Sequence, residues 1–337
     1  MEPVLFERCL ISLKPLSGRE TTPGYTNAAK QRLFGNGRLS VPLRFDRKQF
    51  AQESRRNVAG MSISGVQQKL SITRLHGSGE LEPTATGGEF ILKPSPEAFP
   101  HAAENEHAAM LISSALGIPT AQCGLVPFKG GNELAYITRR FDRAEGGEKI
   151  PQEDLLQCAG RRSHEKYDLT YEQAGQIIRA STGKLPPVLD MIQRVILAYI
   201  IGNNDLHMKN LSLQRLEENK SGLLDRLTPN YDVLFCQAFD DPPGHTFFAC
   251  GLLLDTTDGE EEFTPEFERL GFYSRGDFLE LARRLEVPDK PVERFMDKAR
   301  QKQKLILDII DNSYMPTSMK ARAADTVTNR LSALRPR

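Results

Sequence analysis

Residues 201–210 read I-G-N-N-D-L-H-M-K-N, and this stretch decides how the rest of the chain is interpreted. Apolar residues precede it at helical spacing: Leu189, Ile192, Val195, Ile196, Tyr199 and Ile200. After it, the segment Leu211-Ser212-Leu213 alternates in polarity as a strand does. We therefore predict that residues 201–210 form a loop between a buried helix and a short strand.

Within this loop an acidic residue, Asp205, is followed five positions later by an amide, Asn210. Protein-kinase catalytic loops use this D-x-x-x-x-N spacing to place a base on the substrate hydroxyl and an amide on magnesium. Asn-Asp pairs also form ordinary turns, so the spacing alone leaves both interpretations open.

A second carboxylate favours the catalytic interpretation. Asp232, in the segment N-Y-D-V-L at residues 230–234, follows Asp205 by 27 residues and a polar turn. In kinases a second Asp at the end of a short β-like run binds the metal ion. We expect the two loops to belong to one active site.

Length and charge bound the alternatives. A length of 337 residues predicts two lobes or domains with a real core. The net charge of the chain is zero. Residues 1–60 carry 11 Lys or Arg against 5 Asp or Glu, a net charge of +6. This excess indicates a partner surface, proximity to nucleic acid, or simply a solvated basic face.

The chain has no apolar run of transmembrane length and opens with no signal peptide, which predicts a soluble, cytoplasmic protein without a membrane partner. Its five cysteines lack C-x-x-C spacing and its histidines form no H-E-x-x-H pair, so we expect reduced thiols and no zinc site. Any metal is expected to be oxygen-liganded magnesium that arrives with a nucleotide.

The first 60 residues read as an irregular lead-in with one strand at residues 4–13. At residues 61–70 the segment M-S-I-S-G-V-Q-Q-K-L runs from small residues into a strand at 70–73. Backbone N–H groups of such a loop can approach phosphate oxygens, and Lys69 would add charge. An ordinary β-turn explains the same segment.

Lys93 ends an apolar strand at residues 89–94, as does the lysine that binds the α and β phosphates in kinases. Glu106 follows 13 residues later on a helix predicted at residues 103–119. This spacing allows a Lys-Glu ion pair, although complementarity to the helix dipole also explains the acid. A further strand that leads into a charged turn is expected over residues 133–143.

The rest of the chain is predicted to be mostly helical, at residues 153–160, 171–182, 188–201, 274–286 and 292–312. An acidic stretch at residues 255–262 is expected to be a solvated surface loop.

Seven motifs in order resemble the HipA-like serine/threonine kinase toxins, and most closely their HipT branch. The motifs are S-I-S-G-V-Q-Q-K-L at 62–70, F-I-L-K-P-S at 90–95, N-E-H at 105–107, R-R-F-D-R at 139–143, P-Q-E-D at 151–154, G-N-N-D-L-H-M-K-N at 202–210 and Y-D at 231–232. The resemblance implies an α+β, two-lobed protein-kinase-like (HipA) fold. Residues 61–140 would form a small β-rich N-lobe and residues 141–337 a larger helical C-lobe, with residues 1–60 packed on or part of the N-lobe.

The resemblance also implies roles for single residues in binding ATP and Mg²⁺. Asp205 would be the catalytic base, Asn210 and Asp232 the magnesium ligands, and Lys93, with Glu106, the phosphate-binding lysine. Further nucleotide-binding residues would be the phosphate loop Ser64, Gly65, Val66, Gln67, Gln68 and Lys69, the hinge Arg139, Arg140 and Phe141, and His207, Lys209 and Tyr231. The better-known HipA pattern has an acidic residue at the position of Arg139 and a small apolar one at that of Ser64.

In this family a serine at the position of Ser62 or Ser64 is autophosphorylated. Such a phosphate would add roughly two negative charges beside the phosphates of the nucleotide, so we expect it to expel the loop and weaken ATP binding. The alternative is that both serines only keep the loop small and flexible.

The function implied is an ATP-dependent serine/threonine kinase that acts as the toxin of a bacterial type II toxin–antitoxin module. Its substrate would be an aminoacyl-tRNA synthetase, tryptophanyl as for HipT or glutamyl as for HipA. A HipB-like DNA-binding antitoxin and a HipS-like small protein would be partners, with no sequence-specific DNA binding by this chain itself. The alternatives are a non-catalytic, nucleotide-binding co-repressor acting with a DNA-binding antitoxin, and a kinase of small molecules.

Overall fold

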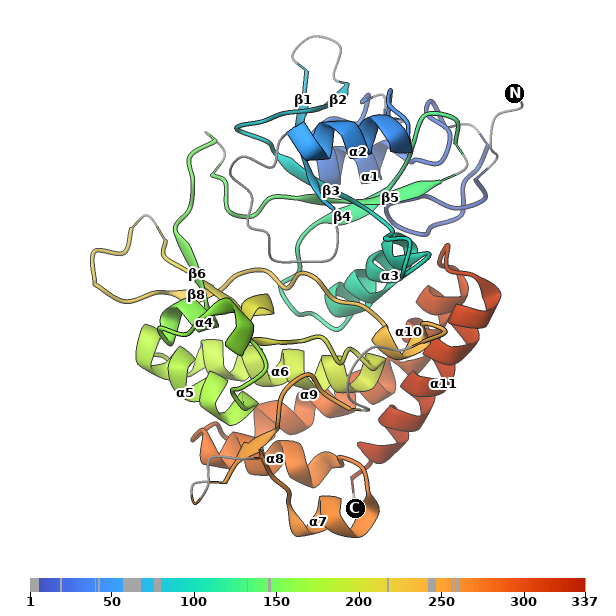
Figure 1. Cartoon of the computed structure of the whole chain (residues 1–337). Helices are drawn as coiled ribbons and strands as arrows, with labels where there is room; N and C mark the ends of the chain where they lie inside the picture. The colour runs from blue at the N-terminus through green and yellow to red at the C-terminus, as the bar shows by residue number, and fades with distance from the viewer. Residues whose placement is uncertain are drawn as a thin grey trace. The chain divides into compact units, whose positions relative to one another are not determined.

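The computed structural model describes residues 6–18, 20–39, 41, 43–56, 68–75, 80–131, 133–144, 147–216, 218–241, 247–255, 257 and 261–336. The chain divides into two compact units, which are described separately (Figure 1). The first unit comprises Met1–Leu111, Ala121–Lys149 and Asn312–Pro316. The second comprises Ile112–Thr120, Ile150–Asp311 and Thr317–Arg337.

An antiparallel sheet of five strands organises the first unit, in the order β2-β1-β3-β5-β4. The strands are β1 (Leu70–Arg74), β2 (Leu81–Pro83), β3 (Phe90–Pro94), β4 (Cys123–Pro127) and β5 (Leu134–Arg139). The strands predicted at residues 70–73 and 89–94 are confirmed, and the one predicted before a charged turn within residues 133–143 is confirmed as β5. The short strands β2 and β4 were not predicted.

The two faces of β3 have different neighbours. Phe90 and Leu92 are buried on one face, and the ring of Phe90 lies 5.4 Å from that of Phe34 in α1 (Asn27–Phe34). Because side chains alternate along a strand, Lys93 lies on the opposite face. There it pairs across the sheet with Tyr136 of β5, and its ammonium group lies 5.5 Å from the ring centre.

The predicted strand at residues 4–13 is wrong over its described part, residues 6–13. This segment forms a turn with an isolated bridge between Arg8 and Pro15. The main chain of Leu10 instead hydrogen-bonds to Gly24 and to Leu125 of β4, which leaves no continuous strand partner. Two helices of the lead-in, α1 and α2 (Arg47–Arg56), were also missed.

The second unit is built around helix α6 (Pro186–Ile201), which packs against α5, α8, α9 and α11 (Figure 1). Nearly every residue of α6 is buried, so its apolar character extends beyond a single face. Its neighbours are α5 (Tyr171–Thr182), α8 (Arg275–Arg284), α9 (Asp289–Gln301) and α11 (Thr317–Ala333). The further helices of this unit are α4 (Leu155–Cys158), α7 (Pro265–Leu270) and α10 (Gln303–Asp311). Helix α3 (Ala102–Ala115) belongs to the first unit up to Leu111 and to the second unit from Ile112.

Short strands complete the second unit: β6 (Gln152–Asp154), β7 (Ser212–Gln214) and β8 (Arg226–Leu227) in one sheet, and β9 (Leu253–Leu254) with β10 (Glu261–Glu262) in another. The strand predicted after residue 210 is therefore confirmed as β7.

Three predictions for this region need correction. The helix expected at residues 153–160 begins as β6, because pairing with β7 overrides local preference, and only α4 is helical. The single helix expected at residues 292–312 is divided at Lys302, whose ammonium group binds the carbonyl oxygen of Ala115. The acidic loop at residues 255–262 ends in the strand β10. The helices predicted at residues 103–119, 171–182, 188–201 and 274–286 are confirmed, with shifted ends in some cases.

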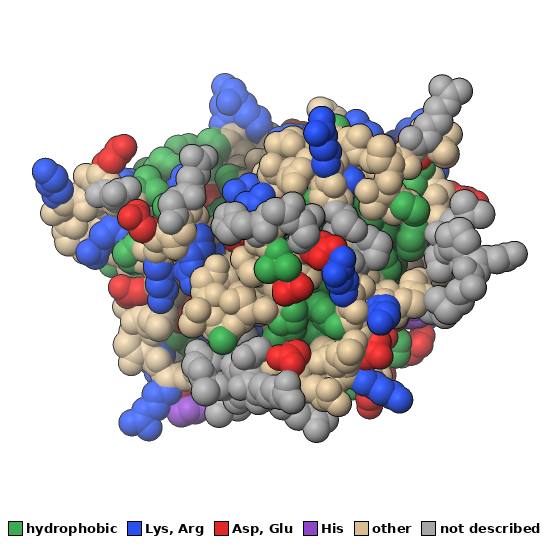
Figure 2. Space-filling model, turned by 90° about the horizontal axis from the view of Figure 1, so that it is seen from above, with side chains coloured by type: hydrophobic (Ala, Val, Ile, Leu, Met, Phe, Trp, Pro, Cys, Tyr) green, Lys and Arg blue, Asp and Glu red, His purple; other side chains and the backbone are tan. Residues whose placement is uncertain are grey.

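Charge is mixed on the face that Figure 2 shows. Basic and acidic side chains of the described residues are interspersed there and form no large patch of one sign. None of the helices in the described part of the chain combines the length and apolar character that a membrane crossing requires.

Candidate active site

Helix α6 ends at Ile201 and is capped by Gly202, from which the loop that the sequence predicted continues. Gly202 has a left-handed backbone (φ 69°), and its N–H bonds back to the carbonyls of the last helical turn. A Cβ atom at this position would lie 3.0 Å from the side chains of Gln237 and Thr326. Glycine is therefore required by both conformation and space. The predicted loop between a buried helix and a strand is confirmed.

Hydrogen bonds within the loop bring Asp205 and Asn210 together. The Asn203 side-chain oxygen accepts a bond from the main-chain N–H of Asp205 (3.2 Å). The amide nitrogen of Asn210 donates to the carbonyl oxygen of Asp205 (2.9 Å). Leu206 and Met208 are buried and anchor the loop, whereas the Asp205 side chain remains 46% exposed. The main chain of Asp205 is thus held by hydrogen bonds, and its carboxylate is open to solvent.

Asp232 approaches the same place from the segment after β8. Its backbone is left-handed (φ 60°), which is uncommon for a residue other than glycine and marks a constrained position. The charges of Asp232 and Asp205 both act on His207 and on Cys236. The two carboxylates therefore act electrostatically on the same pair of side chains, and their membership of one active site stays a prediction.

Burial keeps both of these side chains neutral. It lowers the pKa of His207, an effect that the nearby Asp205 carboxylate opposes. It raises the pKa of the Cys236 thiol to about 12, and the charge of Asp205 acts in the same direction.

Asn210 and Asp232 can provide the oxygen ligands that magnesium prefers. Because the amide nitrogen of Asn210 is used by the Asp205 carbonyl, its amide oxygen is the atom left to bind a cation. In the described part of the chain, no three or more His, Cys, Asp or Glu side chains are grouped to hold a metal. The carboxylate and amide oxygens of Asp232 and Asn210 are donors of the type that suits a hard cation, which would complete its coordination with phosphate oxygens and water.

In the first unit, the predicted pair of Lys93 and Glu106 is confirmed as an ion pair. The lysine Nζ lies 2.8 Å from Oε1 of Glu106 in α3. The two side chains are 13% and 1% exposed, so little water screens the pair. Its role in binding a nucleotide stays a prediction.

The proposed hinge residues follow β5. Arg139 ends the strand and is exposed, and its N–H bonds to the carbonyl of Gln122. The main-chain N–H of Arg140 donates a hydrogen bond to the carbonyl oxygen of Glu89. Its guanidinium donates two hydrogen bonds to the carboxylate of Asp142 (2.8 and 2.7 Å). Burial alone would raise the pKa of Asp142, but this guanidinium holds it below its usual value. Phe141 lies in a bend of the chain. The hinge function of Arg139, Arg140 and Phe141 stays a prediction.

The phosphate loop is described only at its end. Ser62, Ser64, Gly65, Val66 and Gln67 lie outside the described residues. Gln68 is exposed and Lys69 is half-buried, directly before β1.

Sequence reasoning missed Tyr167, which the structure brings to the loop at residues 201–210. Its hydroxyl donates a hydrogen bond to Oδ1 of Asp205 (3.0 Å). Tyr171 was also missed, and its hydroxyl bonds to the carbonyl of Leu206 (2.8 Å). No spacing rule predicts a partner 38 or 35 residues away, so only folding could reveal them.

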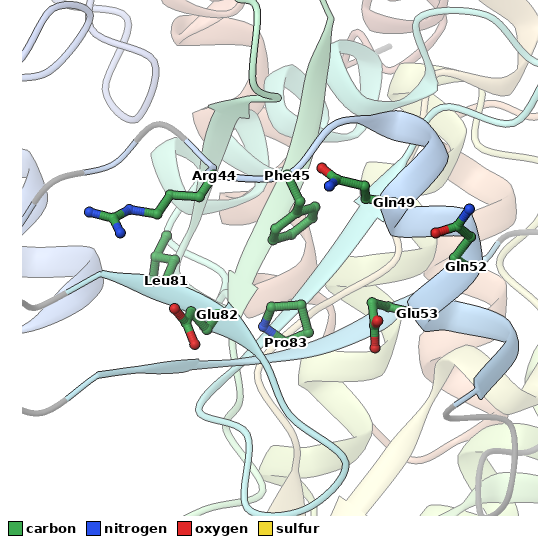
Figure 3. A pocket seen from close by; sticks show the side chains of 8 residues that line it. All are labelled: Arg44, Phe45, Gln49, Gln52, Glu53, Leu81, Glu82 and Pro83. Atoms are coloured by element: carbon green, nitrogen blue, oxygen red, sulfur yellow. The ribbon is translucent and has the colours of Figure 1, made fainter.

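A pocket of about 360 Å³ lies elsewhere in the first unit, between α2 and β2 (Figure 3). It is lined by Arg44, Phe45, Gln49, Gln52, Glu53, Leu81, Glu82 and Pro83. None of these was predicted as a site residue. One basic and two acidic side chains make it a poor match for a triphosphate.

The profile of the HipA-like C-terminal domain matches residues 61–305. The chain belongs to the HipA-like C-terminal domain family. Its matched range includes both loops of the candidate site and the Lys93–Glu106 pair.

Two relatives of this HipA-like chain carry kinase names. A Haemophilus influenzae protein named "Putative kinase" is 30% identical over 340 residues, covering 97% of each chain. A Sinorhizobium fredii protein named "Putative kinase Y4dM" is 27% identical, covering 84% of this chain and 67% of that protein.

Solved structures confirm the predicted α+β, kinase-like HipA fold. HipA of Shewanella oneidensis MR-1, from a complex with HipB and operator DNA, has a TM-score of 0.62 and 20% identity, covering 81% of this chain and 65% of its own. This HipA-like chain thus spans just under two thirds of that protein. The Helicobacter pylori proinflammatory kinase CtkA has a TM-score of 0.51 and 16% identity, covering 81% and 90% of the two chains. At these identities the likeness concerns the fold alone.

Proposed function

We propose that this HipA-like chain is an ATP-dependent serine/threonine protein kinase. The observation that carries the proposal is the loop between α6 and β7. There the exposed carboxylate of Asp205 lies beside an amide that offers its oxygen, and the charge of Asp232 reaches the same surroundings. Phosphoryl transfer needs positioning and charge neutralisation more than covalent catalysis, and these side chains provide such groups.

The proposed roles follow from the chemistry of each group. Asp205 accepts the proton of the acceptor hydroxyl while the hydroxyl oxygen forms a bond to the γ phosphorus. The bond from that phosphorus to the β,γ-bridging oxygen breaks, which releases ADP. Asn210 and Asp232 hold Mg²⁺, which when bound neutralises the phosphate charge. Lys93, oriented by Glu106, binds nucleotide phosphates.

The biological setting is proposed from family likeness. We infer a toxin of a type II toxin–antitoxin module, close to the HipT branch, that phosphorylates an aminoacyl-tRNA synthetase and autophosphorylates at Ser62 or Ser64. The likeness to HipA from a HipA–HipB–operator complex supports a HipB-like antitoxin as partner. A HipS-like protein is the further partner that the HipT resemblance implies.

The proposal is tested with Asp205→Asn and Asp232→Asn, which remove one charge each and keep the side-chain volume. Both variants should lose transfer of labelled γ-phosphate to protein, by about 10³-fold or more. Asp308→Asn changes an exposed carboxylate of α10 in the same way and should transfer phosphate normally. Wild-type rates in the Asp205 variant would refute the site.

A second experiment identifies the acceptor. Phosphoproteomes of cells that express the wild-type chain or Asp205→Asn should differ at a synthetase. If the purified wild-type chain binds ATP with Mg²⁺ but neither gains phosphate nor transfers it to protein, the protein-kinase function is wrong, and the co-repressor and the kinase of small molecules are the functions left.

A further inference from the structure

A short segment of the second unit braces the catalytic loop from outside. This segment, residues 163–167, contains the 3₁₀ turn Ser163–Glu165. The Ser163 hydroxyl accepts a hydrogen bond from the ammonium group of Lys209 (3.2 Å). The carbonyl oxygen of Lys166 accepts one from the N–H of Met208 (3.2 Å). Together with the Tyr167–Asp205 bond, these contacts connect the segment to Asp205, Met208 and Lys209 of the loop.

The ring of Tyr167 is held on two sides. It packs edge-on against the ring of His207, with centres 5.3 Å apart and planes at 69°. The ammonium group of Lys166 lies 4.7 Å from its centre, a cation–π contact. Although Tyr167 is 45% exposed, these contacts restrict its ring and therefore define where its hydroxyl lies.

The carboxylate of Asp205 needs such a constraint. The terminal torsion of an aspartate is broad and about two-fold, so a half-exposed carboxylate has no preferred orientation of its own. Among the described residues, its side-chain contacts, with Tyr167 (3.0 Å) and His207 (3.9 Å), both involve Oδ1. Oδ2 is thereby left for an incoming hydroxyl.

We propose that Tyr167 is a positioning residue, which binds Oδ1 of Asp205 so that Oδ2 faces the acceptor hydroxyl. A base oriented by a third group is the arrangement that proton transfer requires. The proposal rests on the kinase function proposed above. Its competitor is that the Tyr167 hydroxyl occupies the acceptor's place and blocks it, and the two differ in the sign of their effect.

Tyr167→Phe decides between them, because it keeps the ring and removes only the hydroxyl. A hydrogen bond to a charged group is lost, so kcat should fall about 10- to 100-fold while KM for ATP stays within about 2-fold. Tyr314→Phe removes a hydroxyl that bonds to the Arg8 carbonyl in the first unit and should leave kcat unchanged. Melting temperatures of both variants report any general loss of structure.

The contact itself has a readout that does not depend on catalysis. With 3-fluorotyrosine at position 167, the ¹⁹F resonance should move when Asp205→Asn is introduced, and should not move with Asp308→Asn. An unmoved resonance overturns the proposal, because the two side chains would not be in contact.

The kinetic outcomes separate this proposal from the one it rests on. If Asp205→Asn transfers phosphate normally, the kinase site is wrong. If Asp205→Asn is inactive but Tyr167→Phe has wild-type kcat, only the positioning role is wrong. A faster Tyr167→Phe variant would show that the hydroxyl blocks the base.

Discussion

The hydroxyl of Tyr231 donates a hydrogen bond to the main-chain carbonyl oxygen of Lys209, 2.9 Å away. Tyr231 precedes Asp232, and Lys209 precedes Asn210, so this bond joins the segments that carry both proposed magnesium ligands. The same hydroxyl lies 2.7 Å from the Ser212 hydroxyl in β7. Tyr231 was predicted to line the nucleotide site, and this role stays a prediction.

Replacing Tyr231 by Phe should therefore weaken magnesium binding. One ordinary hydrogen bond contributes about 0.5–1.5 kcal/mol, so the magnesium concentration for half-maximal activity should rise about 2- to 10-fold. Tyr25→Phe is the matched control, because that buried hydroxyl also bonds to a carbonyl oxygen, that of Leu125 in the first unit. An unchanged magnesium dependence in Tyr231→Phe would contradict the linkage.

Glu106→Gln tests the Lys93 ion pair without changing side-chain volume. Lys93 would lose its charged partner in a poorly solvated place and orient less well toward phosphates, so KM for ATP should rise about 10-fold. Glu104→Gln, on the same helix, should change it by less than about 2-fold. Equal KM values for the two variants would argue against a nucleotide role for the pair.

Gly202→Ala should destabilise the protein. An L-residue in the left-handed region costs about 1–2 kcal/mol, and the new Cβ would press on Gln237 and Thr326. Gly222→Ala is the control, because nothing lies within 4 Å of its Cβ position. Urea unfolding should show the loss only in the Gly202 variant, and equal unfolding free energies would mean that the turn relaxes.

His107 in α3 makes stability depend on pH. Burial lowers its pKa from 6.5 to about 4, although its bond to the Ile11 carbonyl opposes this. Between these values the unfolded chain binds a proton that the folded protein does not, so this contribution to stability is complete above about pH 6.5 and declines as the pH falls toward about 4.

The experiment compares His107→Gln with wild type by urea unfolding. Between about pH 7.5 and about pH 5, wild type should lose roughly 2 kcal/mol more than His107→Gln, because the variant lacks the buried imidazole. His164→Gln removes an exposed imidazole and should retain the wild-type acid sensitivity. The same loss in all three proteins would assign the effect to other groups.

Sequence-based prediction succeeded for elements that are determined by neighbouring residues and failed for elements that depend on partners far away in the chain. The helix Tyr171–Thr182 was predicted to the residue, because its Thr170 cap, apolar spacing and terminal Gly183 are local signals. The strand β6 was read as helix, because only pairing with β7, which lies some sixty residues further along the chain, makes it a strand. Helix α1 has eight residues and buries Lys30 among its apolar positions, so its pattern was too weak to detect.

The amino-acid sequence by itself determined the loop at residues 201–210 and the chemical groups that it carries. Asp205 and Asn210 are five residues apart, and the loop's own hydrogen bonds hold them together. The Lys93–Glu106 pair was predictable in the same way, since one strand and the helix that follows it supply both partners. Only the tertiary structure decided which tyrosine hydroxyls contact the Asp205 carboxylate and the main chain of Lys209. Tyr167 and Tyr231 reach Asp205 and Lys209 from segments 38 and 22 residues away, and packing of those segments, which no local pattern encodes, sets each hydroxyl's position.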